Sequence, residues 1–255
     1  MRFVDLNCDL GELPEPRSDR WQEKLMRCVT SVNIACGGHA GDSQTMRSTI
    51  RQALKHGVGI GAHPGYEDRA NFGRVELHLS QEELSSCVYR QILALDRIAM
   101  ECGAMIHHVK VHGALYNLAA RNREIARAVA EGVRRWTART ILVGLAGSIM
   151  LEEFRSAGFP VAAEAFADRR YESDGTLRSR KYDDSLLHAP ATAAAQALRI
   201  VEQGSVVAVD GAVIPVAADT ICIHGDTPGA AEIAQAVREQ LTTAGIVLRP
   251  MASCF

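Results

Sequence analysis

The sequence is poor in aromatic residues and has no excess of either charge. Aromatic side chains make up 5% of the 255 residues, and 28 lysines and arginines face 30 aspartates and glutamates, for a net charge of −2. Proteins that bind nucleic acid usually carry a basic stripe, often with stacked aromatics. No apolar run approaches the roughly 20 residues of a membrane-spanning helix. The composition therefore argues against a nucleic-acid partner and a membrane span, while the 47% hydrophobic content suffices for a globular core.

Paired cysteine motifs are also absent. The seven cysteines are scattered without any CxxC pair, which favours neither a disulfide framework nor a cysteine zinc site. Cys8, Cys36 and Cys222 lie in apolar, strand-like runs, where a reduced thiol packs as a small hydrophobe. The first residues are acidic and strand-like, unlike a signal peptide. We therefore expect a cytoplasmic protein with reduced thiols.

What the sequence does contain is a regular alternation of short apolar runs and longer helical patterns. The candidate strands are 3–8, 31–36, 58–62, 107–112, 140–145, 161–166 and 219–224. The candidate helices are 44–57, 80–103, 123–136, 192–204 and 229–245, and Ser80 with Glu83 has the pattern of a capping box. Residues 206–216 form a hairpin pattern around Asp210-Gly211.

This order predicts repeated βαβ units and a parallel sheet, hence an α/β fold. About seven strands without a linker favour one (β/α) barrel domain over residues 1–255, closed or nearly closed. A doubly wound open sheet is the alternative.

Six of the seven strands have one polar face. In the first strand Asp5, Asn7 and Asp9 alternate with apolar residues, because successive side chains point to opposite faces. Further polar residues gather at the carboxyl ends of the other strands: His39, His63, His108, Lys110, His112, Glu164, Asp168, His224 and Asp226. Active sites of (β/α) barrels lie at that end of the barrel. The sequence therefore predicts a functional site there, with Gly37-Gly38 letting the backbone approach a ligand closely.

The residue types are compatible with several chemistries. Asp9, His39 and His63 offer one carboxylate and two imidazoles, a possible divalent metal set of unknown identity. Acid–base histidines without a metal are the alternative. Lys110 and His112 could polarise a carbonyl or bind an anion. Arg169-Arg170 offers guanidinium groups for a carboxylate or phosphate, or is simply a solvated loop pair. The nucleotide-binding patterns GxxxxGK[ST] and GxGxxG do not occur.

Long motifs resemble those of the LamB/YcsF family, which supplies the A subunit of bacterial 5-oxoprolinase. They are VDLNCDLGE, SVNIACGGHAGD, GAHPGYEDRANFGR, HHVKVHGALYN, EAFADRRYESDGTLRSR and ICIHGDTPGA. The resemblance implies a distorted seven-stranded TIM-like barrel related to those of polysaccharide deacetylases. It also implies hydrolysis of the 5-oxo-L-proline lactam to L-glutamate, with ATP as co-substrate giving ADP and phosphate. The 5-oxoprolinase subunits B and C would be the partners.

The matching motifs, together with the strand-end pattern, give the expected site. We expect catalytic roles for Asp9, Glu12, His39, Asp42, His63, Lys110, His112 and His224. We expect substrate or phosphate binding by Asn7, Asp168, Arg169, Arg170 and Asp226.

The chain departs from the family pattern at the barrel mouth. It has CGGHAGDS where relatives usually read CGFHAGDP, and Val111 where proline is usual; segments 13–24 and 181–190 also differ. These departures bear on the substrate more than on the fold. Two other functions therefore stay open: a stand-alone metal-dependent amidase or deacetylase, and a non-catalytic ligand-binding subunit.

Overall fold

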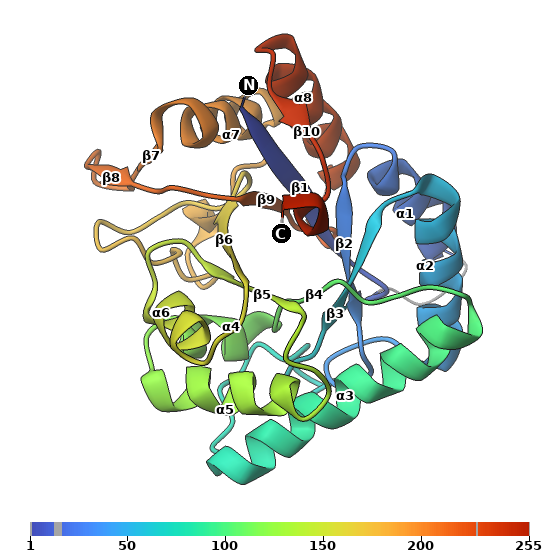
Figure 1. Ribbon diagram of the computed structural model, residues 1–255. Helices are drawn as coiled ribbons and strands as arrows, with labels where there is room; N and C mark the ends of the chain where they lie inside the picture. Colours follow the sequence, from blue (N-terminus) through green and yellow to red (C-terminus); the bar gives the residue numbers. More distant parts are fainter. Residues whose placement is uncertain (1, 13–16, 228, 255) are drawn as a thin grey trace.

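Seven parallel strands close into a barrel, seen along its axis in Figure 1. The computed structural model describes residues 2–12, 17–227 and 229–254. The barrel strands are β1 (Phe3–Leu10), β2 (Ser31–Ala35), β3 (Gly59–His63), β4 (His108–Val109), β5 (Ile141–Leu145), β6 (Val161–Phe166) and β9 (Thr220–Ile223). They pair in this order, and β9 pairs with both β6 and β1. The predicted barrel is thus confirmed, and the open sheet is wrong.

Helices surround the barrel, as βαβ crossovers require (Figure 1). They are α1 (Arg17–Met26), α2 (Ser43–His56), α3 (Gln81–Glu101), α4 (Gly113–Ala119), α5 (Arg123–Arg134), α6 (Ile149–Ser156), α7 (Pro190–Gln203) and α8 (Ala230–Thr243). Short 3-10 helices η1 (Asp183–Ser185) and η2 (Met251–Cys254) complete the helical set. None of the helices in the described part of the chain combines the length and apolarity that crossing a lipid bilayer demands.

The sequence patterns located the long elements well and the short ones poorly. The Ser80–Glu83 capping box is present at the start of α3, and the predicted hairpin is β7 (Ser205–Val207) with β8 (Val213–Pro215). Helices α1, α4 and α6 and the strand β10 (Val247–Leu248) were not predicted. Of the departing segment 13–24, residues 13–16 lie outside the described residues, and the rest belongs to α1.

The barrel interior is polar. Val4, Leu6 and Cys8 of β1 belong to the apolar core that packs under the helices, whereas Asp5 and Asn7 on the opposite face have no exposed surface. The predicted assignment of the two faces is confirmed. An interior of this kind is stable only if each polar group finds a partner, because an unpaired buried charge is very costly.

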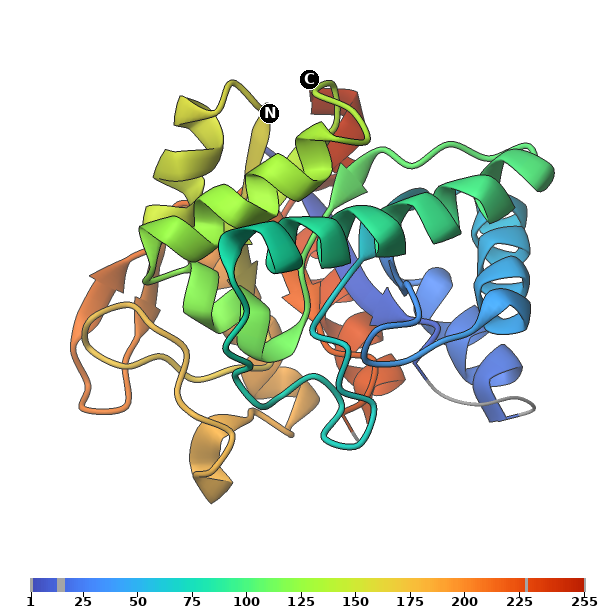
Figure 2. The ribbon, with the colours of Figure 1, turned by 90° about the horizontal axis from the view of Figure 1, so that it is seen from below.

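The C-terminal segment closes the amino end of the barrel, opposite the predicted site (Figure 1). Asp5 there accepts hydrogen bonds from Ser31 Oγ at 2.6 Å and from the backbone N–H of Met251 at 3.2 Å. Met251 is buried against Ile141 and Val143 of β5. This end is therefore sealed, and the loops after the strands form the other end. Figure 2 shows segments 64–80 and 167–189 leaving the barrel on one side.

We expect Gly61→Ala to destabilise the fold. A Cβ at Gly61 would lie 2.1 Å from Nε2 of the buried His108 ring, whereas a Cβ at Gly59, on the same face of β3, would meet its nearest atom at 3.1 Å. Overpacking of this kind costs about 1–3 kcal/mol. Urea unfolding should show the larger loss for Gly61→Ala and a smaller one for Gly59→Ala. Equal stability of the two variants would contradict this role of Gly61.

A candidate active site at the carboxyl end of the barrel

Lys110 lies at the centre of the barrel, directly after β4. Its ammonium is 2.8 Å from Glu164 Oε1 and 3.0 Å from Asp9 Oδ1, and it donates to Asn7 Oδ1 at 3.3 Å. The lysine is 2% exposed. Burial would lower the pKa of Lys110, but Asp9, Cys222 and Glu164 hold that pKa well above its usual value. Lys110 is therefore a charged ammonium buried between two carboxylates.

Side-chain amides below the lysine fix the positions of these carboxylates. Asn33 Nδ2 donates to Asn7 Oδ1 and Asp9 Oδ1, each at 2.8 Å, and Asn33 Oδ1 accepts from His108 Nε2 at 2.8 Å. Asn7 Nδ2 donates to Glu164 Oε1 at 2.9 Å. The two amides make all their hydrogen bonds, although Glu164 Oε2 and His108 Nδ1 have no partner among the described residues, and a network of this density is rigid. We expected Asn7 to bind substrate. The structure instead places it inside this network, below the mouth.

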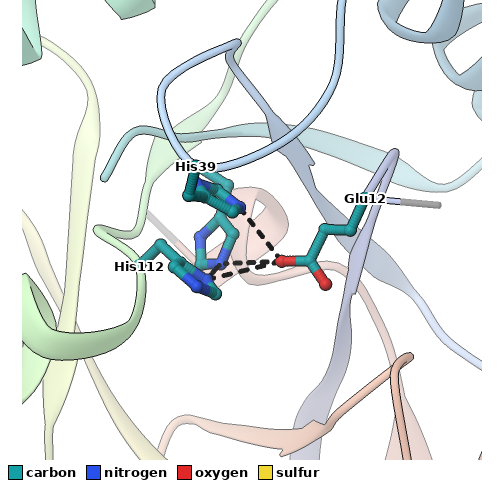
Figure 3. Close-up of side chains that lie close together, drawn as sticks. Glu12, His39 and His112 are labelled. Carbon is teal, nitrogen blue, oxygen red and sulfur yellow. Dashed lines mark hydrogen bonds and ion pairs between the residues drawn. The ribbon is translucent and has the colours of Figure 1, made fainter. Parts of the chain in front are cut away.

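Glu12 and three histidines form a compact cluster at the mouth, above this network (Figure 3). Glu12 Oε1 lies 3.1 Å from His39 Nε2, 3.4 Å from His112 Nδ1 and 3.9 Å from His63 Nε2. His112 Nδ1 and His63 Nε2 are 3.0 Å apart. These four residues come from the ends of β1, β2 and β3 and from the segment after β4, so the barrel brings together the residues predicted from separate motifs.

In two of the histidines, the ring nitrogen that points away from the cluster contacts a backbone carbonyl. His63 Nδ1 lies 2.6 Å from the carbonyl oxygen of Lys110, and His112 Nε2 lies 2.9 Å from that of Phe72. Among the described residues, Phe72 alone is a non-glycine residue with a left-handed backbone (φ 55°), a costly conformation that aims its carbonyl at the ring. The His39 ring stacks on the His112 ring, with centroids 3.7 Å apart.

Burial sets the protonation of this cluster. It lowers the pKa of His39 and of His63 to about 4, and it holds the pKa of His112 well below its usual value. Burial and the negative charge of Asp9 raise the pKa of Glu12 to about 7. At neutral pH the three imidazoles are therefore neutral and can accept protons or coordinate a cation.

A second group of polar residues lines the other side of the mouth. The buried Asp168 accepts a hydrogen bond from His224 Nδ1 at 2.9 Å, which fixes the orientation of the imidazole ring. Asp226 pairs with Arg74 and, at 3.3 Å, with Arg180.

Arg169 lies close to these arginines. It is 4% exposed, and its Nε has no partner among the described residues. Burial and the charge of Arg180 lower the pKa of Arg169 to about 10. Three guanidinium groups near only two carboxylates, one of which already binds His224, form a cationic surface that suits an anion.

Two expected residues lie apart from these groups. Asp42 is exposed and caps α2, where its Oδ1 accepts from the backbone N–H of Thr45 at 2.8 Å. Arg170 binds Asp184 at 3.3 Å in the segment after β6. The structure gives both a local partner outside the clusters at the mouth.

Four contributors to the two layers were missed as site residues: Glu164 and Cys222 beside Lys110, and Arg74 and Arg180 at the mouth. Glu164 was the easiest of the four to predict from the sequence, because it lies on the polar face of its strand. Cys222 was expected to pack as a hydrophobe, yet its sulfur lies 3.0 Å from the Lys110 ammonium. Arg74 and Arg180 lie in loops, where no periodicity indicates the direction of a side chain.

A pocket of about 510 Å³ adjoins the cluster. It lies between Gly37-Gly38, which precede His39, and the helix α3, and its charged lining residues are Glu67, Arg69 and Arg90. Pockets of this size accommodate cofactors and other small molecules.

Comparisons with known proteins agree with this architecture. A profile of the LamB/YcsF family matches residues 4–255. A protein of Chloroflexus aggregans, named as the A subunit of 5-oxoprolinase, is 49% identical over 249 residues, which cover 98% of this chain and 99% of that protein. The crystal structure of a lactam utilization protein from Thermus thermophilus is 43% identical, with a TM-score of 0.89 and coverage of 98% of this chain and 99% of that one.

A more distant likeness concerns the fold alone. The catalytic domain of a peptidoglycan N-acetylglucosamine deacetylase from Eubacterium rectale is 7% identical, with a TM-score of 0.51, and the match covers 98% of this chain and 88% of that one. The expected relation to deacetylase-type barrels is confirmed at the level of the fold.

We expect Lys110→Met to destabilise the protein strongly. The substitution leaves the buried Asp9 and Glu164 carboxylates without their counter-charge, and breaking a buried ion pair in this way costs about 3–5 kcal/mol. Urea unfolding would measure the loss, and the double variant Lys110→Met/Glu164→Gln should recover part of it.

The matched control is Arg90→Met. Arg90 pairs with Glu67 at 3.2 Å, but both side chains are more than half exposed, so its loss should change stability by less than about 1 kcal/mol. If Lys110→Met were as mild as Arg90→Met, the buried ion pair would not stabilise the barrel.

Proposed function

The chain belongs to the LamB/YcsF family, and we propose that it is the A subunit of an ATP-dependent 5-oxoprolinase. In this proposal it hydrolyses the lactam of 5-oxo-L-proline to L-glutamate, while ATP is converted to ADP and phosphate. It acts in the cytoplasm, in a complex with subunits B and C. The observation that carries the proposal is the near-full-length similarity to proteins of that name, together with the convergence of the shared motifs at one barrel mouth.

The need for ATP follows from the chemistry of the substrate. A five-membered lactam is a resonance-stabilised amide, so its carbonyl carbon is a poor electrophile. Transfer of the γ-phosphoryl group of ATP to the lactam oxygen forms an imidate phosphate and releases ADP. Water then adds to that carbon and the carbon–nitrogen bond breaks, which frees the amine and leaves an acyl phosphate. A second water hydrolyses the acyl phosphate, giving the carboxylate of glutamate and free phosphate.

The clusters at the mouth provide groups for each part of this reaction. A neutral histidine of the Glu12 cluster, or His224 oriented by Asp168, would take the proton of the attacking water. The Lys110 ammonium, with its fixed positive charge, would stabilise negative charge that develops on the lactam or phosphoryl oxygens. Arg169 with its neighbours Arg74 and Arg180 would hold the substrate carboxylate or a phosphate.

A stand-alone metal-dependent amidase is the second candidate. The observation that favours it is the cluster of Glu12 with His39, His63 and His112, whose ligand atoms lie within 4.8 Å of one another. Such an enzyme would polarise an amide with a bound cation and would need neither ATP nor partner subunits.

Glutamate release from 5-oxo-L-proline tests the proposal. We expect glutamate when the purified chain, subunits B and C and ATP are all present, and none when ATP or the partners are left out. A relative of verified activity, assayed with the same B and C preparations, is the positive control. Amide hydrolysis by the chain alone, without ATP, would favour the second candidate. No glutamate beside an active control would refute the proposed substrate.

Asp9→Asn and His112→Ala should abolish turnover while the circular dichroism spectrum stays unchanged. Each removes a charged or proton-accepting group at the mouth, and the loss of one such group costs about 10²–10⁴-fold in kcat. His188→Gln, which changes an exposed histidine, should keep full activity in the same assay. Full activity in either test variant would remove that residue from the mechanism.

A further inference from the structure

We propose that Glu12, His63 and His112 bind a divalent cation of the zinc class. The ligand atoms are Glu12 Oε1, His63 Nε2 and His112 Nδ1. This inference goes beyond the proposed reaction and does not depend on it, because it follows from hydrogen bonding around the two imidazoles.

The first argument is the placement of the ring protons. A carbonyl oxygen can only accept a hydrogen bond, so the contacts to Lys110 O and Phe72 O require N–H groups at His63 Nδ1 and His112 Nε2. In the neutral rings the remaining nitrogens, His63 Nε2 and His112 Nδ1, carry lone pairs. These two lone-pair nitrogens face each other at 3.0 Å. Two lone pairs at that distance repel each other unless a proton or a metal ion lies between them, and the position of Glu12 favours the metal ion.

The second argument is the spacing of the three ligand atoms. A tetrahedral cation with ligand bonds of about 2.0–2.1 Å separates its ligands by roughly 3.4 Å. The separations here are 3.0 Å between His63 and His112, 3.4 Å between Glu12 and His112, and 3.9 Å between Glu12 and His63. These three separations lie on either side of the expected value, so the ligand atoms are already placed for a cation with the backbone as it stands. The set of two histidines and a carboxylate also leaves a position open for water or substrate.

The third argument comes from the surroundings of the ligands. Metal-bound histidines usually donate their second ring N–H to a carbonyl or carboxylate, as His63 and His112 do. His39 has a different role. Its ring lies parallel to that of His112, with an interplanar angle of 5° and centroids 3.7 Å apart, so the lone pairs of the two rings do not converge on one point. Its Nε2 instead lies 3.1 Å from Glu12 Oε1 and positions that carboxylate.

The proposed ligands differ from the set expected from sequence. Asp9, His39 and His63 were expected, but the Asp9 Oδ1 atom is engaged by Lys110 and Asn33. Its Oδ2 atom lies 3.5 Å from His63 Nε2, close to the proposed centre. Asp9 therefore borders the cation site, and its negative charge favours a cation there.

Metal binding to the isolated chain tests this proposal without any activity assay. The chain is stripped with a chelator, dialysed and titrated with Zn²⁺ by calorimetry and with Co²⁺ by visible absorption. We expect one equivalent of tightly bound Zn²⁺ and the intense visible bands of a four- or five-coordinate cobalt ion.

Variants of the ligands locate the site. His63→Gln and His112→Gln should each weaken binding at least about 100-fold, since even changes to groups that only orient ligands cost 10–100-fold. His188→Gln also removes one histidine, but an exposed one, and should bind as the wild type does. Because substitutions of buried residues can unfold a protein, ¹⁵N spectra of histidine-labelled wild type give a second readout. Zn²⁺ should shift His63 Nε2 and His112 Nδ1.

Two results would overturn the proposal. One is a folded wild-type chain that binds no stoichiometric Zn²⁺ or Co²⁺, in which case His63 and His112 share a proton. The other is folded His63→Gln and His112→Gln variants that bind Zn²⁺ as tightly as His188→Gln. Neither result involves ATP, 5-oxo-L-proline or partner subunits, so a failure of the cation site and a failure of the proposed function can be told apart.

Discussion

The buried ammonium of Lys110 is the interaction on which the rest of this barrel depends. Barrel interiors of this class are usually filled with branched aliphatic side chains, whereas here Asn7 and Asp9 of β1 and Glu164 of β6 point inward. One positive charge, within 3.0 Å of both carboxylates, makes that interior tolerable. The same contacts fix the carboxyl ends of β1, β4 and β6 relative to one another. The positions of the residues beyond those ends, Glu12 among them, follow from this arrangement.

Two electrostatic environments lie next to each other along the barrel axis. In the deeper one, charges are paired and amides are saturated, which suits a rigid scaffold. In the outer one, burial keeps His39 and His63 neutral, and their Nε2 atoms lie 3.1 and 3.9 Å from Glu12 Oε1. The Lys110 backbone connects the two, because its side chain belongs to the inner layer and its carbonyl orients His63 in the outer layer.

The order and number of the predicted strands favoured a closed or nearly closed barrel, and the alternation along β1 predicted its polar interior. The polar residues at the strand ends predicted which end bears the candidate site. These patterns could not predict which polar residues serve structure and which serve chemistry. Asn7 and Asp9 lie on the same face of β1. They differ in depth: the amide of Asn7 is deep in the barrel and makes all its hydrogen bonds, whereas the carboxylate of Asp9 lies near the mouth. The arginines Arg74 and Arg180 escaped prediction because they lie in loops, whose paths depend on the whole fold. Helices α4 and α6 are short and lack side-chain caps, so little local signal marks them.

The closure of the barrel also determines when the chain can fold. Asp5 in the first strand binds Thr30 and Ser31 early in the sequence, but its carboxylate also binds Thr220 and the N–H of Met251 near the other end. Strand β1 likewise has β2 on one side and β9 on the other. A chain emerging from the ribosome therefore carries a carboxylate that lacks two of its partners, and a strand with one unpaired edge, until nearly all of the chain has been synthesised. Non-local contacts of this kind make folding slow and expose intermediates to aggregation. The barrel is thus expected to complete its fold only after translation, and it would benefit from chaperones that shield the first strands meanwhile.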